Sequence, residues 1–171
     1  MIPVLLVVVG VCAGAVIAVV VVGALLPVAH TETRTVTLRQ RPDEVWKTVS
    51  DVDRYPSWRP GVRSIKRLDD GFWQEYDGRQ LVTYEQVEAI PSTRFVTRIA
   101  DEGLPYGGTW TVVVAPAPDG GCTVTVTEDG EVYNPVFRFV SRFIMGHSST
   151  ASAYLKALGA RFGAAVTPEV G

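Results

Sequence analysis

Hydrophobic residues are distributed along this chain in two unlike ways. Residues 4–26 read VLLVVVGVCAGAVIAVVVVGALL, and the first charged side chain of the protein is Glu32. A helix over this run is about 34 Å long, slightly more than the ~30 Å hydrocarbon core of a bilayer. The pattern therefore predicts a transmembrane helix within an anchor at residues 1–29, followed by a linker at residues 30–32.

A cleavable signal peptide is the alternative interpretation of this apolar run. No Lys or Arg precedes it, and it exceeds the ~7–15 residues usual for the core of a signal peptide, so an uncleaved anchor is favoured. Arg34, Arg39 and Arg41 follow the run, so the positive-inside rule predicts a single-pass membrane protein with a cytoplasmic C-terminal domain. Gly10 and Gly14 form one GxxxG pattern that could join two such helices in a homodimer, although a lone motif of small residues is a weak signal.

Beyond residue 32 the apolar positions recur every second residue. In the run TRTVTLR at residues 33–39, Val36 and Leu38 alternate with Thr and Arg, which predicts a half-buried strand. Pro42 and the two carboxylates after it predict the start of a helix. Further extended runs lie at residues 62–68, 72–76, 81–89, 94–100, 109–115 and 122–127. The segments between them are too short for crossover helices, so the predicted sheet is antiparallel.

The C-terminal part of the chain changes to a helical period. Apolar side chains near one helix face recur at Phe137, Val140, Ile144, Ala151, Leu155, Leu158 and Phe162. Asn134 and Pro135 suit the start of this helix, and Gly146 with the hydroxyl-rich residues 148–150 could kink or break it in the middle. Residues 164–171 are expected to form a flexible tail.

These elements predict an α+β domain over residues 33–163. Its sheet is curved and antiparallel, with about seven strands that grip one long C-terminal helix. A single amphipathic helix covers only part of such a sheet, and the space that remains between the two is where apolar ligands bind.

Composition and charge exclude several classes of function. The 171 residues include 16 Lys and Arg, 18 Asp and Glu, two His and two Cys. Broad nucleic-acid binding needs a surplus of basic side chains, which is lacking. Two cysteines cannot form a disulfide scaffold, and so few His and Cys argue against a zinc site, so we expect no metal and no cofactor. The sequence shows no dinucleotide fingerprint and no nucleophile elbow.

Three segments resemble a known superfamily. They are RPDEVWKTVSDVDRYPSWRPGV near the start of the domain, LPYGGTWTV in its middle, and EDGEVYNPVFRFVSRFIMG before YLKALGARFG. In this order they resemble the SRPBCC superfamily of START-like helix-grip domains, and within it the polyketide cyclase/dehydrase and lipid-transport group. The resemblance implies a deep cavity between the sheet and the C-terminal helix that binds hydrophobic or amphipathic small molecules. It implies no catalytic set, because family members include enzymes, carriers and proteins without assigned activity.

Glu128 is the main candidate for chemistry. It shares a strand face with Val124 and Val126, so it points at the predicted cavity, where an apolar environment would raise the pKa of its carboxyl. The alternative is a bulge at Gly130 or an ion pair with Arg138 or Arg142, and structural ion pairs are the commoner case. Tyr84 is the second candidate for proton transfer, and neither residue has an obvious catalytic partner.

The remaining candidates concern ligand contact. His147 could shuttle protons, but a helix-end or surface position is the commoner role of such a residue. Arg138 and Arg142 could hold an anionic head group, or they could pair with Glu131 or Asp129 at the surface. The predicted ligand-contacting set combines strand residues of the inner face with residues of the last helix: Phe95, Trp110, Val112, Val126, Glu128, Phe139, Arg142 and Phe143.

Three functions remain open from the sequence. The favoured hypothesis is a membrane-anchored domain that binds or carries a hydrophobic small molecule, lipid-like or polyketide-like. The second is an enzyme of the cyclase or dehydratase type acting on such a molecule. The third is a membrane-bound interaction module without a small ligand. The missing catalytic constellation counts against the enzyme.

Overall fold

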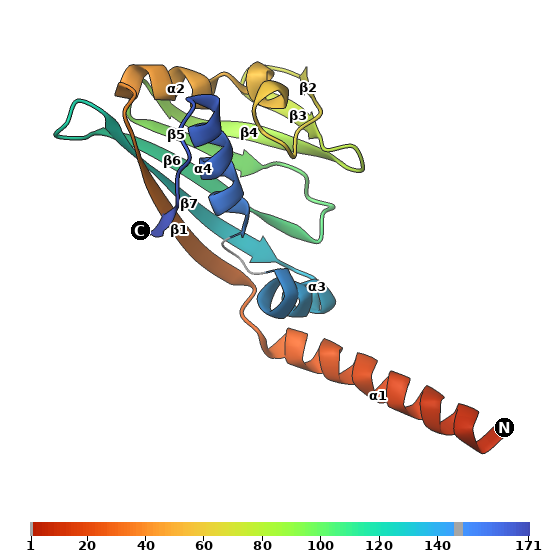
Figure 1. The fold of residues 1–171 in the computed structure, drawn as a ribbon. Helices are drawn as coiled ribbons and strands as arrows, with labels where there is room; N and C mark the ends of the chain where they lie inside the picture. Colours follow the sequence, from red (N-terminus) through yellow and green to blue (C-terminus); the bar gives the residue numbers. More distant parts are fainter. Residues whose placement is uncertain (1, 146–148) are drawn as a thin grey trace.

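One antiparallel sheet organises the domain in this computed structural model, which describes residues 2–145 and 149–171 (Figure 1). Its strands are β1 (Ala29–Leu38), β2 (Ser64–Arg67), β3 (Phe72–Tyr76), β4 (Leu81–Ile90), β5 (Arg94–Ile99), β6 (Tyr106–Pro116), β7 (Cys122–Val132) and β8 (Glu169–Val170). They are ordered β2-β3-β4-β5-β6-β7-β1-β8, so the long connection from β1 to β2 spans the sheet. The predicted antiparallel sheet is confirmed, and its eighth strand comes from the C-terminal tail.

The tail lies along β1 instead of hanging free. Val170 and Glu169 pair with Arg34 and Thr35 of β1, and the backbone amide of Gly171 donates to the carbonyl of Thr33. Val166 packs against the edge of the core. This segment was expected to be a flexible tail; its backbone instead satisfies the outer edge of β1.

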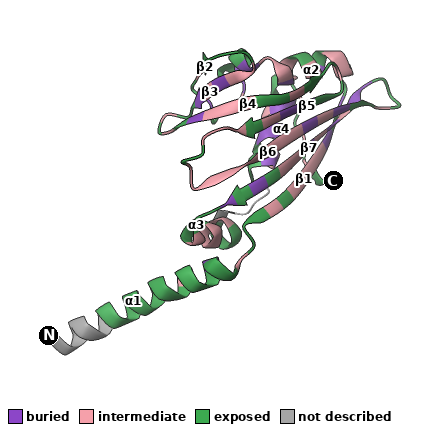
Figure 2. Ribbon diagram, turned by 180° about the vertical axis from the view of Figure 1, so that it is seen from behind, coloured by how far each residue is buried: buried purple, intermediate pink, exposed green. Residues whose placement is uncertain are grey.

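Alternation along β1 and β7 separates the two faces of the sheet. Val36 of β1 pairs with Val124 of β7, and both side chains are buried on the inner face. The outer face carries threonines, where the hydroxyls of Thr35 and Thr125 lie 3.0 Å apart. Figure 2 shows buried and less buried positions alternating along these strands. The period of two that predicts a half-buried strand therefore holds in β1.

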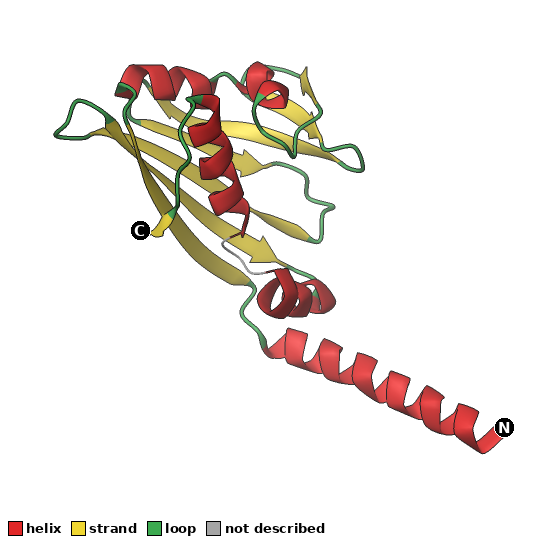
Figure 3. Ribbon diagram, in the orientation of Figure 1, coloured by secondary structure: helices red, strands yellow, loops and turns green. Residues whose placement is uncertain are grey.

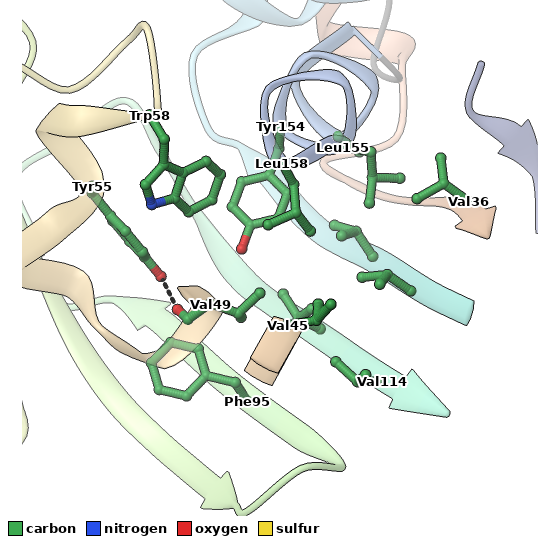
Figure 4. Packing of buried hydrophobic residues seen from close by; sticks show 14 of the residues in the cluster. Val36, Val45, Val49, Tyr55, Trp58, Phe95, Val114, Tyr154, Leu155 and Leu158 are labelled. Atoms are coloured by element: carbon green, nitrogen blue, oxygen red, sulfur yellow. Dashed lines mark hydrogen bonds between the residues drawn. The ribbon is translucent and has the colours of Figure 1, made fainter. Parts of the chain in front are cut away.

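Two short helices follow β1, as predicted. Helix α2 (Pro42–Ser50) has proline in its first turn, with Asp43 and Glu44 near its positive end, and it buries Val45 and Val49. The 3-10 helix η1 (Val52–Ser57) follows directly. Its Tyr55 hydroxyl donates a 2.7 Å hydrogen bond to the carbonyl of Val49, which ties the two helices together (Figure 4).

The C-terminal helical region is divided, so the expectation of one long helix is wrong. Helix α3 (Pro135–Val140) continues as a turn of π-helix, η2 (Ser141–Met145), and α4 begins only at Ser149 and ends at Arg161. The two parts take separate places, with α4 crossing the sheet and α3 lying beyond the end of β7 (Figure 3). Ile144 is 71% exposed and leaves the predicted apolar stripe.

The start of α3 follows the predicted capping pattern. The Asn134 side chain accepts hydrogen bonds from the amides of Val136 and Phe137, at 2.9 and 3.2 Å. Pro135 occupies the first turn, where it loses no helical hydrogen bond. The cap fixes the direction in which the chain leaves β7.

Helix α4 covers only part of the inner face. Its Ala151, Leu155 and Leu158 are fully buried and join a cluster with Val36, Val124 and other valines of the sheet (Figure 4). The helix packs on β1 and β7, whereas α2 packs on β5 and β6. The ends of β3–β6 that lie nearer to α3 are therefore covered by neither α2 nor α4.

Helix α1 (Ile2–Leu25) leads away from the sheet, and most of its described side chains are exposed (Figures 1 and 2). Its C-terminal end packs on α3, where Gly23 lies so close to Pro135 that a Cβ would not fit. Arg138 of α3 donates a 2.8 Å hydrogen bond to the carbonyl of Leu26. Within the described part of the chain, no helix is long and apolar enough to cross a membrane, so the predicted transmembrane span is not confirmed.

The packing of α4 generates the first prediction. Leu158→Ala removes a fully buried side chain and is expected to lower the free energy of unfolding by about 2–5 kcal/mol, because a cavity remains beside the sheet. Lys156→Ala, on the exposed side of the same helix, is the control and is expected to change it by about 0.5 kcal/mol or less. Chemical denaturation measures both. Equal losses would show that α4 does not depend on this face.

Candidate functional site

An apolar cavity of about 440 Å³ lies between the sheet, α4 and α3. Its walls come from the inner faces of β3 to β7, from η1 and α4, and from Phe137 of α3. This volume falls within the range of small-molecule sites in proteins. The cavity occupies the part of the sheet that α4 does not cover.

Aromatic rings form much of the cavity wall. Trp73 stacks on Tyr84 with ring centroids 5.7 Å apart and planes inclined by 16°. Tyr154 of α4 meets Trp110 of β6 edge-on at 5.5 Å, and it meets Trp58 in the same way at 5.3 Å. Interlocked rings hold one another in place and present flat apolar surfaces to the cavity.

A buried ion pair lies at the wall formed by η1 and β3. Arg59 donates to Glu75 Oε1 at 3.1 Å, and Trp73 Nε1 donates to the same oxygen at 3.1 Å. The guanidinium carbon lies 4.5 Å from the centre of the Tyr55 ring and 5.4 Å from that of Tyr154. Burial alone would lower the pKa of Arg59, but the Glu75 carboxylate and nearby tyrosines raise it. The pair is therefore charged and internally balanced.

Glu128 of β7 lines the cavity on the side away from β3. The pairing of β7 with β1 and β6 runs one-to-one through Gly130, so no bulge turns Glu128 outward. Its Oε2 atom is buried and has no hydrogen-bond partner within the described residues. Burial, and secondly the Glu32 carboxylate on β1, raise the pKa of Glu128 from its ordinary 4.5 to about 7. A carboxyl in this state can donate or accept a proton near neutral pH.

His30 is the titratable neighbour that the sequence did not identify. Its Nε2 atom lies 3.9 Å from Glu128 Oε1. The imidazole lies over Gly130, its partner across the strand pair, and a side chain at that position would collide with the ring. Sequence analysis placed His30 in the linker, but β1 begins at Ala29 and pairs as far as Glu131. Gly130, which leaves room for the imidazole across the strand pair, was the sequence feature that could have indicated this position of His30.

Two tyrosine hydroxyls differ in their hydrogen bonding. Burial raises the pKa of both Tyr55 and Tyr154 well above the ordinary value. The Tyr55 hydroxyl donates its one proton to Val49, so it can interact with the Tyr154 hydroxyl only as an acceptor. The Tyr154 hydroxyl is buried and makes no hydrogen bond within the part of the chain that the structure describes. It points away from α4 (Figure 4) and is available to a ligand.

The structure brings together the strand residues that the sequence selected. Phe95, Trp110, Val112, Glu128 and Tyr84 all line the cavity. Val126 has the expected orientation but is fully buried in the core cluster and does not line the cavity. A period of two therefore identifies the inner face, but it does not say which part of that face the helix covers.

The helical candidates are placed differently. Phe139 and Phe143 pack on each other with centroids 4.9 Å apart, and neither lines the cavity. Phe143 and Arg142 are exposed, because η2 turns this segment outward. Arg138 donates to the backbone carbonyls of Leu26 and Tyr133, and within the described residues it forms no ion pair with Glu131 or Asp129. The contact of Phe139, Arg142 and Phe143 with a ligand stays a prediction, because these side chains do not line the cavity as the structure describes it.

Other residues enter the site from positions that the sequence left unassigned. Phe137 lines the cavity, although it was expected in the core stripe. Arg59 comes from the loop between two prolines, and Glu75 alternates inward with Trp73 on β3. An acidic residue on a buried strand face could have identified Glu75 as a site residue. No local pattern identifies Arg59, which lies 16 positions earlier in the chain, as its partner. His147 lies outside the described residues.

The described residues were also compared with the requirements of a metal site. Across residues 2–145 and 149–171, no group of three or more His, Cys, Asp or Glu side chains could hold a metal ion. Among the residues that the structure describes, the site combines an apolar cavity with the Arg59–Glu75 ion pair, the Glu128 carboxyl and the Tyr154 hydroxyl.

Comparison with known proteins places this architecture in a family. Residues 29–160 match the family described as polyketide cyclase / dehydrase and lipid transport. Among curated proteins, no sequence matches this chain. A conserved protein from Geobacillus kaustophilus has a similar structure, with TM-score 0.68 and 15% identity, covering 82% of this chain and 99% of that one.

Two further solved structures share the fold. A START superfamily protein from Mycobacterium smegmatis gives TM-score 0.61 at 17% identity, covering 77% of this chain and 96% of the other. Norcoclaurine synthase from Thalictrum flavum gives TM-score 0.62 at 13% identity, with 79% and 87% covered. At these identities the likeness establishes the fold alone.

The buried ion pair gives a stability prediction. Arg59→Met leaves the Glu75 carboxylate buried without its cation and is expected to lower the free energy of unfolding by about 3 kcal/mol. The double variant Arg59→Met/Glu75→Gln removes both charges and is expected to recover most of that loss. Urea denaturation of the wild type, the single variants Arg59→Met and Glu75→Gln, and the double variant completes the cycle. Additive losses would contradict the pairing.

The Glu128 carboxyl gives a pH prediction. Its pKa is raised on folding from 4.5 to about 7, so its contribution to stability is full below pH 4.5 and is lost as the pH rises through 7. Glu128→Gln removes this penalty. Relative to the wild type, the variant is expected to gain roughly 2–3 kcal/mol between pH 5 and pH 8, since one pKa unit corresponds to about 1.4 kcal/mol. Parallel stability curves from urea denaturation would contradict it.

Proposed function

The chain belongs to the polyketide cyclase / dehydrase and lipid transport family, and on that premise we propose that it binds and carries one hydrophobic small molecule in the cavity between sheet and α4. The family supports a hydrophobic ligand or a cyclase role for this fold. The finer assignment to a carrier rests on the site itself. Its walls are mostly apolar and aromatic, which suits the holding of an apolar molecule.

The observation that carries this proposal is the aromatic-walled cavity of about 440 Å³. Trp73, Tyr84, Trp110 and Tyr154 brace one another around it. Apolar surface of a ligand that leaves water for this space gains roughly 25 cal/mol per Å². The walls are held by ring contacts before any ligand arrives, so little ordering is needed on binding.

An enzyme of the cyclase or dehydratase type is the second candidate, and one observation favours it. Glu128 has a pKa of about 7 and faces the cavity with His30 3.9 Å away. Such a pair can move a proton to or from a bound molecule. Conversion of a bound molecule by the wild type, lost in Glu128→Gln with binding retained, would move the assignment from carrier to enzyme.

Binding of a neutral apolar probe tests the carrier proposal directly. N-phenyl-1-naphthylamine is expected to bind the full chain at one site with increased fluorescence. Thr97→Phe places a ring in the cavity, because Thr97 lines it, and is expected to weaken binding at least tenfold.

The matched control is Arg98→Phe, the next residue on β5, where the side chain is exposed and pairs with Glu85. This variant adds the same ring on the opposite face of the sheet and is expected to bind like the wild type. Equal binding by all three proteins would place the probe outside the cavity. Absence of binding to the wild type would contradict the proposal.

A further inference from the structure

The positive charge in the cavity is already committed. Arg59 donates to Glu75 at 3.1 Å and has the rings of Tyr55 and Tyr154 against its guanidinium. Glu75 also accepts from Trp73. An anionic ligand at this cation would lie beside the Glu75 carboxylate, which already balances its charge. We therefore expect this wall to contribute little to the binding of a carboxylate.

The negative charge on the opposite wall has no comparable partner. Oε2 of Glu128 is buried without a hydrogen bond in the described chain, and the side chain is only 18% exposed. The nearest basic atom, His30 Nε2, lies 3.9 Å from Oε1, beyond hydrogen-bond distance. Glu32 adds a second negative charge nearby and is itself paired with Arg34 at 3.4 Å.

A second polar group in the same cavity is also unsatisfied. Tyr154 is 6% exposed, and its hydroxyl lines the cavity without a hydrogen-bond partner in the described residues. A buried polar group without a partner is costly, so the Glu128 carboxylate favours a ligand that supplies hydrogen-bond donors, and the Tyr154 hydroxyl favours any ligand with a polar group beside it. The faces of Trp110 and Tyr84 in the same walls also attract cations.

We propose that the cavity selects an apolar molecule carrying a protonated amine, which pairs with the Glu128 carboxylate, and that it discriminates against apolar carboxylates such as free fatty acids. This selectivity rests on the proposed carrier function and names its ligand class. The ammonium supplies N–H donors to Glu128 Oε2 and neutralises a charge that the protein leaves unbalanced. A carboxylate would add a like charge to the same wall.

The pairing makes binding depend on pH. The groups that face Glu128 are His30 and Glu32 from β1, Trp110 from β6 and the Tyr84 phenol from β4. Glu128 ionises near pH 7, whereas a primary amine stays protonated to about pH 10. The affinity for an amine is therefore expected to rise about tenfold or more from pH 5.5 to pH 8.

Three matched probes separate this selectivity from simple apolar binding. They are 2-naphthylethylamine, 2-naphthylethanol and 2-naphthylacetate, which share one ring system and differ in charge. Calorimetric titration of the full chain at pH 8 is expected to give at least tenfold tighter binding for the amine than for the alcohol. The acetate is expected to bind most weakly.

Two variants identify the residue responsible. Glu128→Gln is expected to abolish the preference for the amine and its pH dependence while leaving the affinity for the alcohol within about twofold. Glu88→Gln on β4 is the control, because its carboxylate lies outside the cavity and accepts from Arg94 Nε at 3.0 Å. It is expected to keep the preference. Thermal melting followed by circular dichroism verifies that both variants fold.

The outcomes distinguish the two proposals. Equal affinity for amine and alcohol, or a preference that survives in Glu128→Gln, would overturn the amine selectivity and leave the carrier function standing. Tighter binding of the acetate would overturn it as well. Failure of the wild type to bind any of the three probes would contradict the carrier function itself.

Discussion

The packing of α4 against the sheet determines where this protein is full and where it is hollow. Ala151, Leu155 and Leu158 fill the space over β1 and β7, where valines from alternate positions project inward. Side chains in such a core interdigitate closely, so nothing else enters there. Because α4 begins only at Ser149 and α3 turns away, the neighbouring part of the inner face keeps a cavity instead of a core. The site is thus a consequence of how far one helix extends.

The polar groups in that cavity follow a simple rule about burial. A buried charge must be paired and hydrogen-bonded or it shifts toward its neutral form. Arg59 and Glu75 are paired with each other, and the Glu75 carboxylate accepts a second hydrogen bond from Trp73. Glu128 instead shifts toward its neutral form, since its pKa rises to about 7. The difference between these two carboxyls gives the cavity its chemical asymmetry.

Sequence patterns predicted the sheet, the early helices and the inner-face residues well, because these depend on local periodicity. Strand alternation assigned Trp110, Val112 and Glu128 to the inner face, and Phe95 was selected as a large apolar side chain on a strand; all four line the cavity. Phe139, Arg142 and Phe143 were placed on the same helix as Leu155 and Leu158, but they lie on α3 and η2 and do not line the cavity as described. A helical period predicts which residues share a face only within one helix, and α3 and α4 take different positions on the domain. The Arg59–Glu75 pair and the position of His30 over Gly130 depend on contacts between distant segments, which periodicity does not contain.

The central claim is that a molecule occupies this cavity, and native mass spectrometry of the gently purified full chain tests it most directly. The account predicts a reproducible mass increase of one small molecule, released by organic extraction and lost in Thr97→Phe. A bare protein mass that stays unchanged after incubation with extracts of apolar metabolites would contradict it.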